Sequence, residues 1–183
     1  MAITDYKIIF TGPVGAGKTT AITSISDSAP VKTDTKATDM TQNKKSHTTV
    51  AMDYGVLKLE DGEQIHLYGT PGQERFDFMW DILTTGGIGL VLLIDNTQKD
   101  PMKDLRFFVD AFADFIKETS IVVGVTRMDL AKKPVLEDYR VTLKSLGLNP
   151  PLFEVDARDK HDISLLIQAL LFTLDPNLNE ANG

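Results

Sequence analysis

The chain of 183 residues is long enough for one hydrophobic core, and 42% of its residues are hydrophobic. The net charge of −7 disfavours a nucleic-acid surface, and the absence of cysteine excludes disulfides, thiolate metal sites, prenylation and palmitoylation. No signal peptide and no apolar run near the ~20 residues of a membrane span are visible, so we expect a cytoplasmic protein without a membrane anchor of its own.

Short apolar runs rich in β-branched residues alternate with helical patterns, as expected for parallel strands that are covered on both faces. The predicted strands are residues 6–12, 66–69, 88–96, 119–126 and 151–157. The predicted helices are residues 17–27, 101–118, 135–147 and 162–174. This alternation predicts a three-layer α/β fold with helices on both faces of the sheet. No repeat or linker divides the chain, so we expect one domain over residues 1–183, with a core of about 5–174 and a short C-terminal tail.

Two segments depart from the alternation. The turn-forming residues 60–62 predict a hairpin between a strand near 50–59 and one near 63–68. Residues 28–48 are polar and rich in Thr and Lys, and they predict a long mobile loop.

The stretch GPVGAGKT, residues 12–19, follows a predicted strand and opens a predicted helix, as a phosphate-binding loop requires. In such a loop, backbone N–H groups converge on phosphate oxygens and the helix N-terminus adds the positive end of its dipole. We expect Lys18 to reach the β- and γ-phosphates, the Thr19 hydroxyl to ligate Mg²⁺ and Thr20 to contact the α-phosphate. The expected nucleotide contacts here are Val14, Gly15, Ala16, Gly17, Lys18, Thr19 and Thr20.

The stretch TRMD, residues 126–129, ends a later predicted strand and resembles the N/T-K-x-D motif that reads guanine. A carboxylate at Asp129 can accept both the ring N–H and the exocyclic amine of guanine, whereas adenine offers no such donor pair. Arg127 is expected to lay its stem and planar head along the base, and Thr126 opens the motif.

Taken in order, these motifs resemble those of the Ras-superfamily small GTPases over about residues 5–174. The stretch GTPGQERF, residues 69–76, resembles the nucleotide-sensing switch of that superfamily, with Gly69 in place of an aspartate on the magnesium side. The amino-acid sequence of this stretch is most similar to that of the prokaryotic MglA-like and conservon-type GTP-binding proteins, which also lack that aspartate. The resemblance implies a G domain whose six-stranded sheet has one antiparallel strand, GTP or GDP with Mg²⁺ as ligands, and a roadblock-domain dimer as partner.

The resemblance also implies roles for single residues. Gln73 orients the attacking water, the N–H of Gly72 senses the γ-phosphate, and Thr49 contacts both Mg²⁺ and the γ-phosphate, with the adjacent Thr48 left open as its alternative. The stretch DAR, residues 156–158, resembles the loop in which the Ala157 N–H meets the guanine carbonyl oxygen. The implied nucleotide contacts outside the phosphate loop are Thr49, Gly72, Thr126, Arg127, Asp129, Ala157 and Arg158, and the implied metal ligands are Thr19 and Thr49.

We therefore expect a slow GTP-hydrolysing switch. Val14 stands where Ras-type proteins have a glycine that admits an arginine finger, and Gly69 lacks a carboxylate, so a nucleotide-gated scaffold without useful hydrolysis is one alternative. An ATP-using phosphotransferase with Asp95 as its Walker B aspartate is another. The aromatic residues near Trp80 have two interpretations, as core or as a partner-facing surface in which Trp80 or Phe78 is the anchor.

Overall fold

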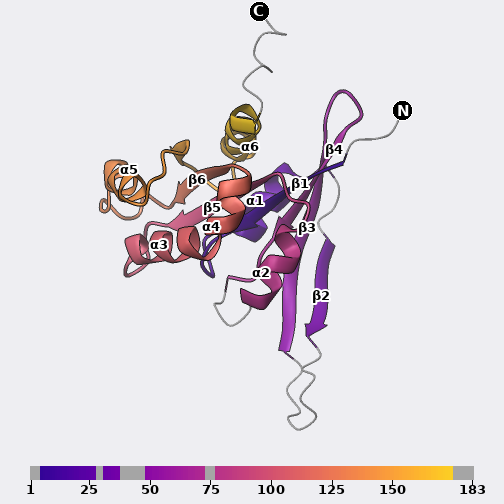
Figure 1. The fold of residues 1–183 in the computed structure, drawn as a ribbon, viewed down its shortest axis with the longest axis horizontal. Coiled ribbons are helices and arrows are strands. Elements are labelled where there is room, and N and C mark those ends of the chain that lie inside the picture. Colours follow the sequence, from indigo (N-terminus) through magenta and orange to yellow (C-terminus); the bar gives the residue numbers. More distant parts are fainter. Residues whose placement is uncertain (1–4, 28–30, 38–47, 73–76, 175–183) are drawn as a thin grey trace, which may run out of the picture.

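The computed structural model describes residues 5–27, 31–37, 48–72 and 77–174, with the backbone alone in 31–37 and 48–52. Within these residues the chain forms one twisted sheet with helices on both faces, so the predicted α/β architecture is confirmed (Figure 1). The strands are β1 (Asp5–Thr11), β2 (Val31–Ala37), β3 (Thr48–Lys58), β4 (Gln64–Gly69), β5 (Gly89–Asp95), β6 (Ile121–Thr126) and β7 (Leu152–Glu154). The helices are α1 (Lys18–Ile25), α2 (Asp77–Thr84), α3 (Pro101–Ala111), α4 (Ala113–Glu118), α5 (Leu136–Ser145) and α6 (Lys160–Leu174).

The strands are arranged in the order β2-β3-β4-β1-β5-β6-β7. β1 lies parallel to both β4 and β5, and β6 continues the parallel set between β5 and β7. β3 runs antiparallel to both of its neighbours, so it is the one antiparallel strand that was expected. It forms the predicted hairpin with β4, closed by a hydrogen bond of 2.9 Å from the Leu59 N–H to the Glu63 carbonyl oxygen.

The sheet has a seventh strand, because β2 forms inside the segment predicted to be a loop. β2 pairs with β3 in a register from Val31 opposite Tyr54 to Ala37 opposite Thr48. Its sequence, VKTDTKA, is polar and rich in threonine, which suits an edge strand but carries no apolar signal. The remainder of the predicted loop, at residues 28–30 and 38–47, lies outside the described residues.

Each face of the sheet has its own hydrophobic core. On one face, α1 and α6 pack against residues such as Phe10, Leu67 and Val91, and on the other α2, α3, α4 and α5 cover Ile9, Leu92 and neighbours. This two-sided burial explains why β5, β6 and the central part of β1 are almost continuously apolar. Because β1, β5 and β6 are parallel neighbours, their carboxyl ends lie together at one edge of the sheet.

Two helical predictions need correction. The segment 101–118 is divided at Phe112 into α3 and α4, although hydrogen bonds from Phe112 N–H to Phe108 and from Ile116 N–H to Phe112 continue across the break. The short helix α2 was not predicted as a helix. None of the helices in the described ranges has the length and apolarity that crossing a membrane requires.

Trp80, on α2, belongs to the core and is only 4% exposed. Its ring stacks on Phe112 with 5.1 Å between the ring centroids, and its Nε1 donates a hydrogen bond of 3.1 Å to the Pro71 carbonyl oxygen. The partner-facing interpretation of Trp80 is therefore wrong. Phe78, on the same helix, is 57% exposed and keeps that interpretation open.

Candidate functional site

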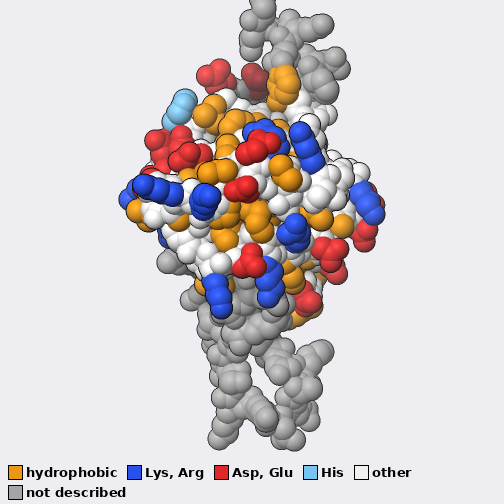
Figure 2. Space-filling model, turned by 90° about the vertical axis from the view of Figure 1, so that its left-hand side faces the viewer, with side chains coloured by type: hydrophobic (Ala, Val, Ile, Leu, Met, Phe, Trp, Pro, Cys, Tyr) orange, Lys and Arg blue, Asp and Glu red, His pale blue; other side chains and the backbone are white. Residues whose placement is uncertain are grey.

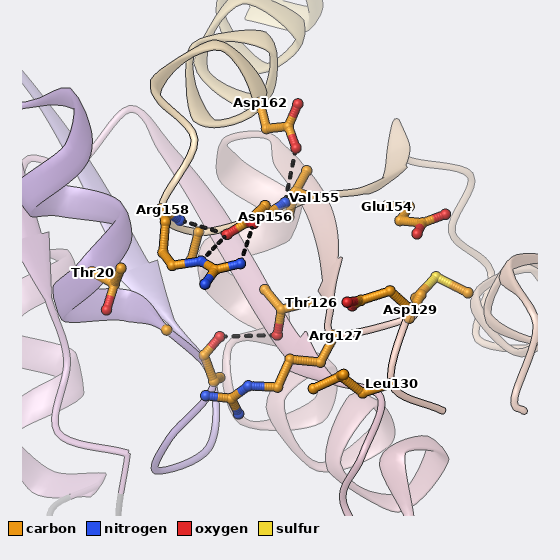
Figure 3. Close-up of a pocket in the computed structure, with 14 residues that line it drawn as sticks. Thr20, Thr126, Arg127, Asp129, Leu130, Glu154, Val155, Asp156, Arg158 and Asp162 are labelled. Atoms are coloured by element: carbon orange, nitrogen blue, oxygen red, sulfur yellow. Dashed lines mark hydrogen bonds and ion pairs between the residues drawn. The ribbon is translucent and has the colours of Figure 1, made fainter. Parts of the chain in front are cut away.

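A cavity of about 570 Å³ lies at the carboxyl edge of the parallel strands, where the loops after β1, β6 and β7 converge (Figure 3). This volume is within the range of pockets that hold a small ligand. Its lining comes from segments far apart in the sequence: Ala16, Gly17, Thr20, Thr126, Arg127, Met128, Asp129, Leu130, Glu154, Val155, Asp156, Ala157, Arg158 and Asp162.

The loop between β1 and α1 follows a path that only glycine adopts easily. Gly12, Gly15 and Gly17 have φ of 144°, 81° and 101°, in the region that side chains rarely enter. A methyl group at Gly12 would collide with the Leu93 carbonyl of β5. The loop thus lies tightly on the sheet, and α1 begins directly after it, which is the geometry of an anion-binding helix N-terminus.

Lys18, the first residue of α1, is folded back over this loop and is only 7% exposed. Its Nζ donates hydrogen bonds of 2.6 Å to the Gly12 carbonyl oxygen and 2.7 Å to the Pro13 carbonyl oxygen. Burial lowers the pKa of Lys18 to about 8, against an opposing effect of the Asp53 carboxylate. The chain therefore holds a buried ammonium at the mouth of the loop, where a phosphate would supply the missing negative charge.

Gly72 lies against the same loop. A methyl group at this position would lie 2.5 Å from the Val14 backbone nitrogen and 2.9 Å from Lys18 Nζ. The structure thus brings together Gly72 and the phosphate-loop residues that were predicted to share the γ-phosphate. The Val14 side chain is 60% exposed beside them.

The TRMD residues are tied to the phosphate loop by hydrogen bonds. Thr126 Oγ1 donates to the Ala16 carbonyl oxygen at 3.2 Å, and Arg127 Nη1 donates to the Gly15 carbonyl oxygen at 2.9 Å. Arg127 has a positive φ of 58°, which turns the chain sharply at the end of β6. Asp129 is exposed and directs its carboxylate toward the space between Thr126 and Arg158 (Figure 3).

Asp95, at the end of β5, is fully buried and forms an ion pair with Arg127. It also accepts hydrogen bonds from Thr97, at 2.9 Å from the backbone N–H and 2.6 Å from the hydroxyl, and from Gln98 at 3.1 Å. Although burial acts to raise the pKa of Asp95, the hydrogen bonds of Thr97 and Gln98 and the charge of Arg127 together lower it. Asp95 is therefore tied to the TRMD loop through Arg127, and the sequence motifs gave no indication of this pairing.

The DAR loop is held by its own charges. The Arg158 side chain donates to Asp156 at 2.9 Å from Nε and 2.7 Å from Nη2, and these bonds with the charge of Arg158 lower the pKa of Asp156 to about 2. The Asp156 N–H donates to Asp162 of α6 at 2.8 Å. Ala157 is buried, and a methyl group at Gly17 would lie 2.9 Å from its Cβ. This fit brings the predicted residues Ala157 and Gly17 into contact.

Not all predicted site residues converge. Gln73 lies outside the described residues. Thr49 is on β3, and at roughly 3.3 Å per residue its backbone lies about 13 Å along the strand from Asp53. Thr19 does not line the cavity, and its hydroxyl donates a short hydrogen bond to the Asp53 carboxylate.

Asp53 is thus a residue at the site to which the sequence motifs assigned no role. It lies on β3 directly opposite Gly69 of β4, in the stretch TVAMD. Asp53 could have been identified from the sequence as an acidic residue on the strand predicted to pair with Gly69, the position where an aspartate was expected.

The donor atoms present fit Mg²⁺. Threonine hydroxyls and carboxylates are hard oxygen ligands, and Mg²⁺ is usually held by one or two protein oxygens together with substrate phosphates and water. Over the described ranges, no group of three or more His, Cys, Asp or Glu side chains could hold a metal by itself. A magnesium ion at Thr19 therefore requires a bound phosphate.

The charged side chains on the face that includes α3 and α5 are of both signs. Figure 2 shows lysines and arginines interspersed with acidic residues there, between apolar patches. On this face the positive charges do not form the continuous stripe that nucleic-acid binding requires.

Comparison with known proteins gives one family and several distant relatives. A family model described as "Conserved hypothetical ATP binding protein" matches residues 10–170. The chain is 27% identical over 179 residues to the GTP-binding nuclear protein GSP1 of Encephalitozoon cuniculi, covering 94% of this chain and 78% of that protein. It is 28% identical over 145 residues to the Ras-related protein Rab-10 of Diplobatis ommata, with coverage of 78% and 64%. It is 23% identical over 187 residues to the GTP-binding protein ypt1 of Schizosaccharomyces pombe, with coverage of 97% and 82%.

Proposed function

The chain belongs to the family of conserved hypothetical ATP-binding proteins. Within this nucleotide-binding family, we propose that it is a GTP-binding molecular switch that hydrolyses GTP slowly. The observation that carries the proposal is the joining of the TRMD loop to the phosphate loop, through Thr126 and Arg127, around one cavity. A base held by the first loop and phosphates held by the second would then be fixed relative to each other.

The choice of guanine rests on Asp129. Its exposed carboxylate faces the cavity, and guanine can donate to it from two nitrogens, whereas adenine cannot. Two of the distant relatives are named as GTP-binding, in agreement with this assignment, while the family description names ATP. Competition between GTP and ATP therefore tests the choice of base directly.

On the phosphate side, Lys18 would neutralise the β- and γ-phosphates, because its buried ammonium already lies against the loop carbonyls. Mg²⁺ would supply charge neutralisation between the phosphates, with Thr19 as a ligand and Thr49 as a second ligand in the GTP state. Gly72 lies against the loop, so its N–H would report the presence of the γ-phosphate to the segment that follows.

Hydrolysis is assigned to Gln73, which would orient the attacking water. We propose an intrinsic rate of roughly 10⁻⁴ to 10⁻² per second, typical of G domains that lack an added cation in the transition state. Gln73→Leu should lower the single-turnover rate and leave the GTP affinity nearly unchanged, because the glutamine acts on the transition state. A wild-type protein with no measurable turnover, with or without a partner, would instead favour a nucleotide-gated scaffold.

An ATP-using phosphotransferase is the second candidate, favoured by the family description. It would need Asp95 as a Walker B carboxylate on the metal side. Asp95 is instead bonded to Arg127, Thr97 and Gln98, so its carboxylate is committed to the base-side loop. This commitment makes the phosphotransferase the weaker candidate.

The partner is proposed by resemblance to the MglA-like and conservon-type proteins, and would be a roadblock-domain dimer in the cytoplasm. Phe78, exposed on α2 just after the switch segment, is the aromatic side chain that could anchor such a partner. Capture by the GTP-bound form but not by the GDP-bound form, weakened in Phe78→Ala, would support this part.

The test of the main proposal is competition for the site. Purified protein is loaded with tritiated GDP, and the label displaced by unlabelled GTP, GDP or ATP is measured. In a separate sample, the protein is denatured as purified and the nucleotide that it releases is identified. We expect GTP and GDP to displace the label at concentrations several orders of magnitude below those of ATP. Equal displacement by ATP would overturn the guanine assignment and favour the second candidate.

A further inference from the structure

Gly69 is a glycine for reasons of space. Its backbone is not in the left-handed region, so the main chain there would accept any residue. It is buried, and a methyl group at this position would lie 3.1 Å from Asp53 Cβ, 3.2 Å from Ile22 Cδ1 and 3.3 Å from Asp53 Oδ2. The side chains that take up the space over Gly69 are therefore those of Asp53 and Ile22, and Asp53 is the one that carries a charge.

The register of the β3–β4 hairpin produces this arrangement. Asp53 and Gly69 are direct partners across the antiparallel pair, so their side chains project on the same face of the sheet. An aspartate at Gly69 and the aspartate at position 53 would compete for one volume. The chain thus carries a carboxylate on the neighbouring strand, with Asp53 Oδ2 3.3 Å from the place of a Cβ at position 69.

The Asp53 carboxylate is directed at the phosphate loop. Thr19 Oγ1, the hydroxyl predicted to ligate the metal, donates a hydrogen bond to Asp53 Oδ2. Asp53 is half-buried and lies near the N-terminus of α1. A hydroxyl and a carboxylate that already touch are the pair of hard oxygen donors that Mg²⁺ selects.

We propose that Asp53 is the metal-side carboxylate of this site, acting with Thr19 in place of the aspartate that Gly69 lacks. The inference rests on the proposed nucleotide site but not on the identity of the base. Asp53 and Thr19 would hold the magnesium ion, and the ion would supply the charge that slows nucleotide release.

The experiment measures the release of tritiated GDP from the full chain with Mg²⁺ present and after chelation with EDTA. In the wild type we expect chelation to accelerate release strongly. In Asp53→Asn, which keeps the shape and a hydrogen-bond acceptor but removes the charge, release should be fast already with Mg²⁺, and EDTA should change it little. The Mg²⁺ concentration that half-restores slow release should rise by about 10- to 100-fold.

Two further variants separate a metal role from a structural one. Asp61→Asn removes the same charge from the exposed turn of the same hairpin, and its response to EDTA should match the wild type. The exchange variant Asp53→Gly with Gly69→Asp moves the carboxylate to the neighbouring strand and should recover part of the Mg²⁺ dependence. Gly69→Asp alone should lose it, since two carboxylates would crowd one space. Thermal unfolding without nucleotide checks that each variant is folded.

The outcomes distinguish a failure of the proposed function from a failure of the role proposed for Asp53. If the wild type does not retain GDP at all, the proposed function fails. If the wild type retains GDP in a Mg²⁺-dependent way and folded Asp53→Asn responds to EDTA as the wild type does, the site stands and the role of Asp53 is overturned. A uniform loss of affinity in Asp53→Asn, with the EDTA response intact, would also overturn it and show a purely structural contact.

Discussion

Gly17 and Ala157 come from opposite ends of the chain and both line the cavity, where they lie so close that a methyl group at Gly17 would be 2.9 Å from Ala157 Cβ. Gly17 ends the phosphate loop with a φ of 101°, and Ala157 follows the last strand of the sheet. Their contact sets the separation between the loop that would hold phosphate and the loop that would hold the base.

Gly17→Ala should therefore weaken nucleotide binding more than it weakens the fold. The positive φ costs about 1–2 kcal/mol for any side chain, and the new methyl group would lie 2.9 Å from Ala157 Cβ. Gly62→Ala is the matched control, because Gly62 has a φ of 84° in open space at the hairpin turn. Gly62→Ala should lose only the stability that the positive φ costs, and Gly17→Ala should lose more because of the contact with Ala157. Only Gly17→Ala should lose GDP affinity. Equal affinities would show that the contact does not shape the site.

The ion pair of Arg127 with Asp95 should contribute to stability in the absence of nucleotide. Replacing Arg127 with methionine leaves a fully buried carboxylate without its counter-charge, and we expect a loss of about 1–3 kcal/mol in the free energy of unfolding. Arg127→Lys should lose less, since a positive charge remains but the planar fork is gone. A urea unfolding series compares the three proteins, and an unchanged stability in Arg127→Met would contradict the expectation.

The stability of the protein in acid should depend on the ion pair of Asp95 with Arg127. The pKa of Asp95 is lowered in the folded protein, so its contribution to stability is present above the unfolded pKa, near 4, and is lost as the pH falls through the folded value. Removing the Arg127 charge raises the folded pKa, so Arg127→Met should unfold at a higher pH than the wild type. Circular dichroism during acid titration measures the two midpoints, and coincident midpoints would show that Arg127 does not set this pKa.

Base recognition should follow Asp129. Asp129→Asn replaces an acceptor by a group that also donates, so GDP should bind at least tenfold more weakly while xanthosine diphosphate gains. Competition against tritiated xanthosine diphosphate measures the exchange. Asp138→Asn, an exposed carboxylate on α5, is the control and should leave both affinities unchanged. If Asp129→Asn discriminates as the wild type does, another residue reads the base.

Trp80 and Phe78 should differ sharply as alanine variants. Trp80 is buried in an aromatic stack with Phe108 and Phe112, so Trp80→Ala should cost about 3–5 kcal/mol of unfolding free energy. Phe78 is largely exposed, and its loss should cost about 1 kcal/mol or less. Denaturant unfolding separates the two, and similar losses would contradict the assignment of Trp80 to the core.

Much of this arrangement could be predicted from sequence because it depends on local pattern. Buried parallel strands are continuously apolar, and a glycine-rich loop between a strand and a helix has few interpretations other than a phosphate-binding loop. β2 escaped prediction because its sequence, VKTDTKA, carries no apolar alternation, and the strand is recognised only by its backbone pairing with β3. α2 escaped because Phe78 and Ile82 are exposed, which obscures the periodicity of a short helix.

The role of Asp53 could not be read from a motif because it depends on register. The glycine at position 69 indicates that a carboxylate is absent there, but only the pairing of β3 with β4 shows that Asp53 lies opposite Gly69. The pairing of Asp95 with Arg127 is similar, since the two residues meet only because β5 and β6 are neighbours and end at the same level.

The bond from Trp80 to Pro71 has a practical consequence. The chain has a single tryptophan, and its indole N–H donates to the residue just before Gly72. Any displacement of Gly72 by a γ-phosphate would strain or break this bond and change the polarity around the ring. The intrinsic ultraviolet emission of the unlabelled protein would thus report on the proposed switch, and we expect its wavelength to shift when GDP is exchanged for GTP.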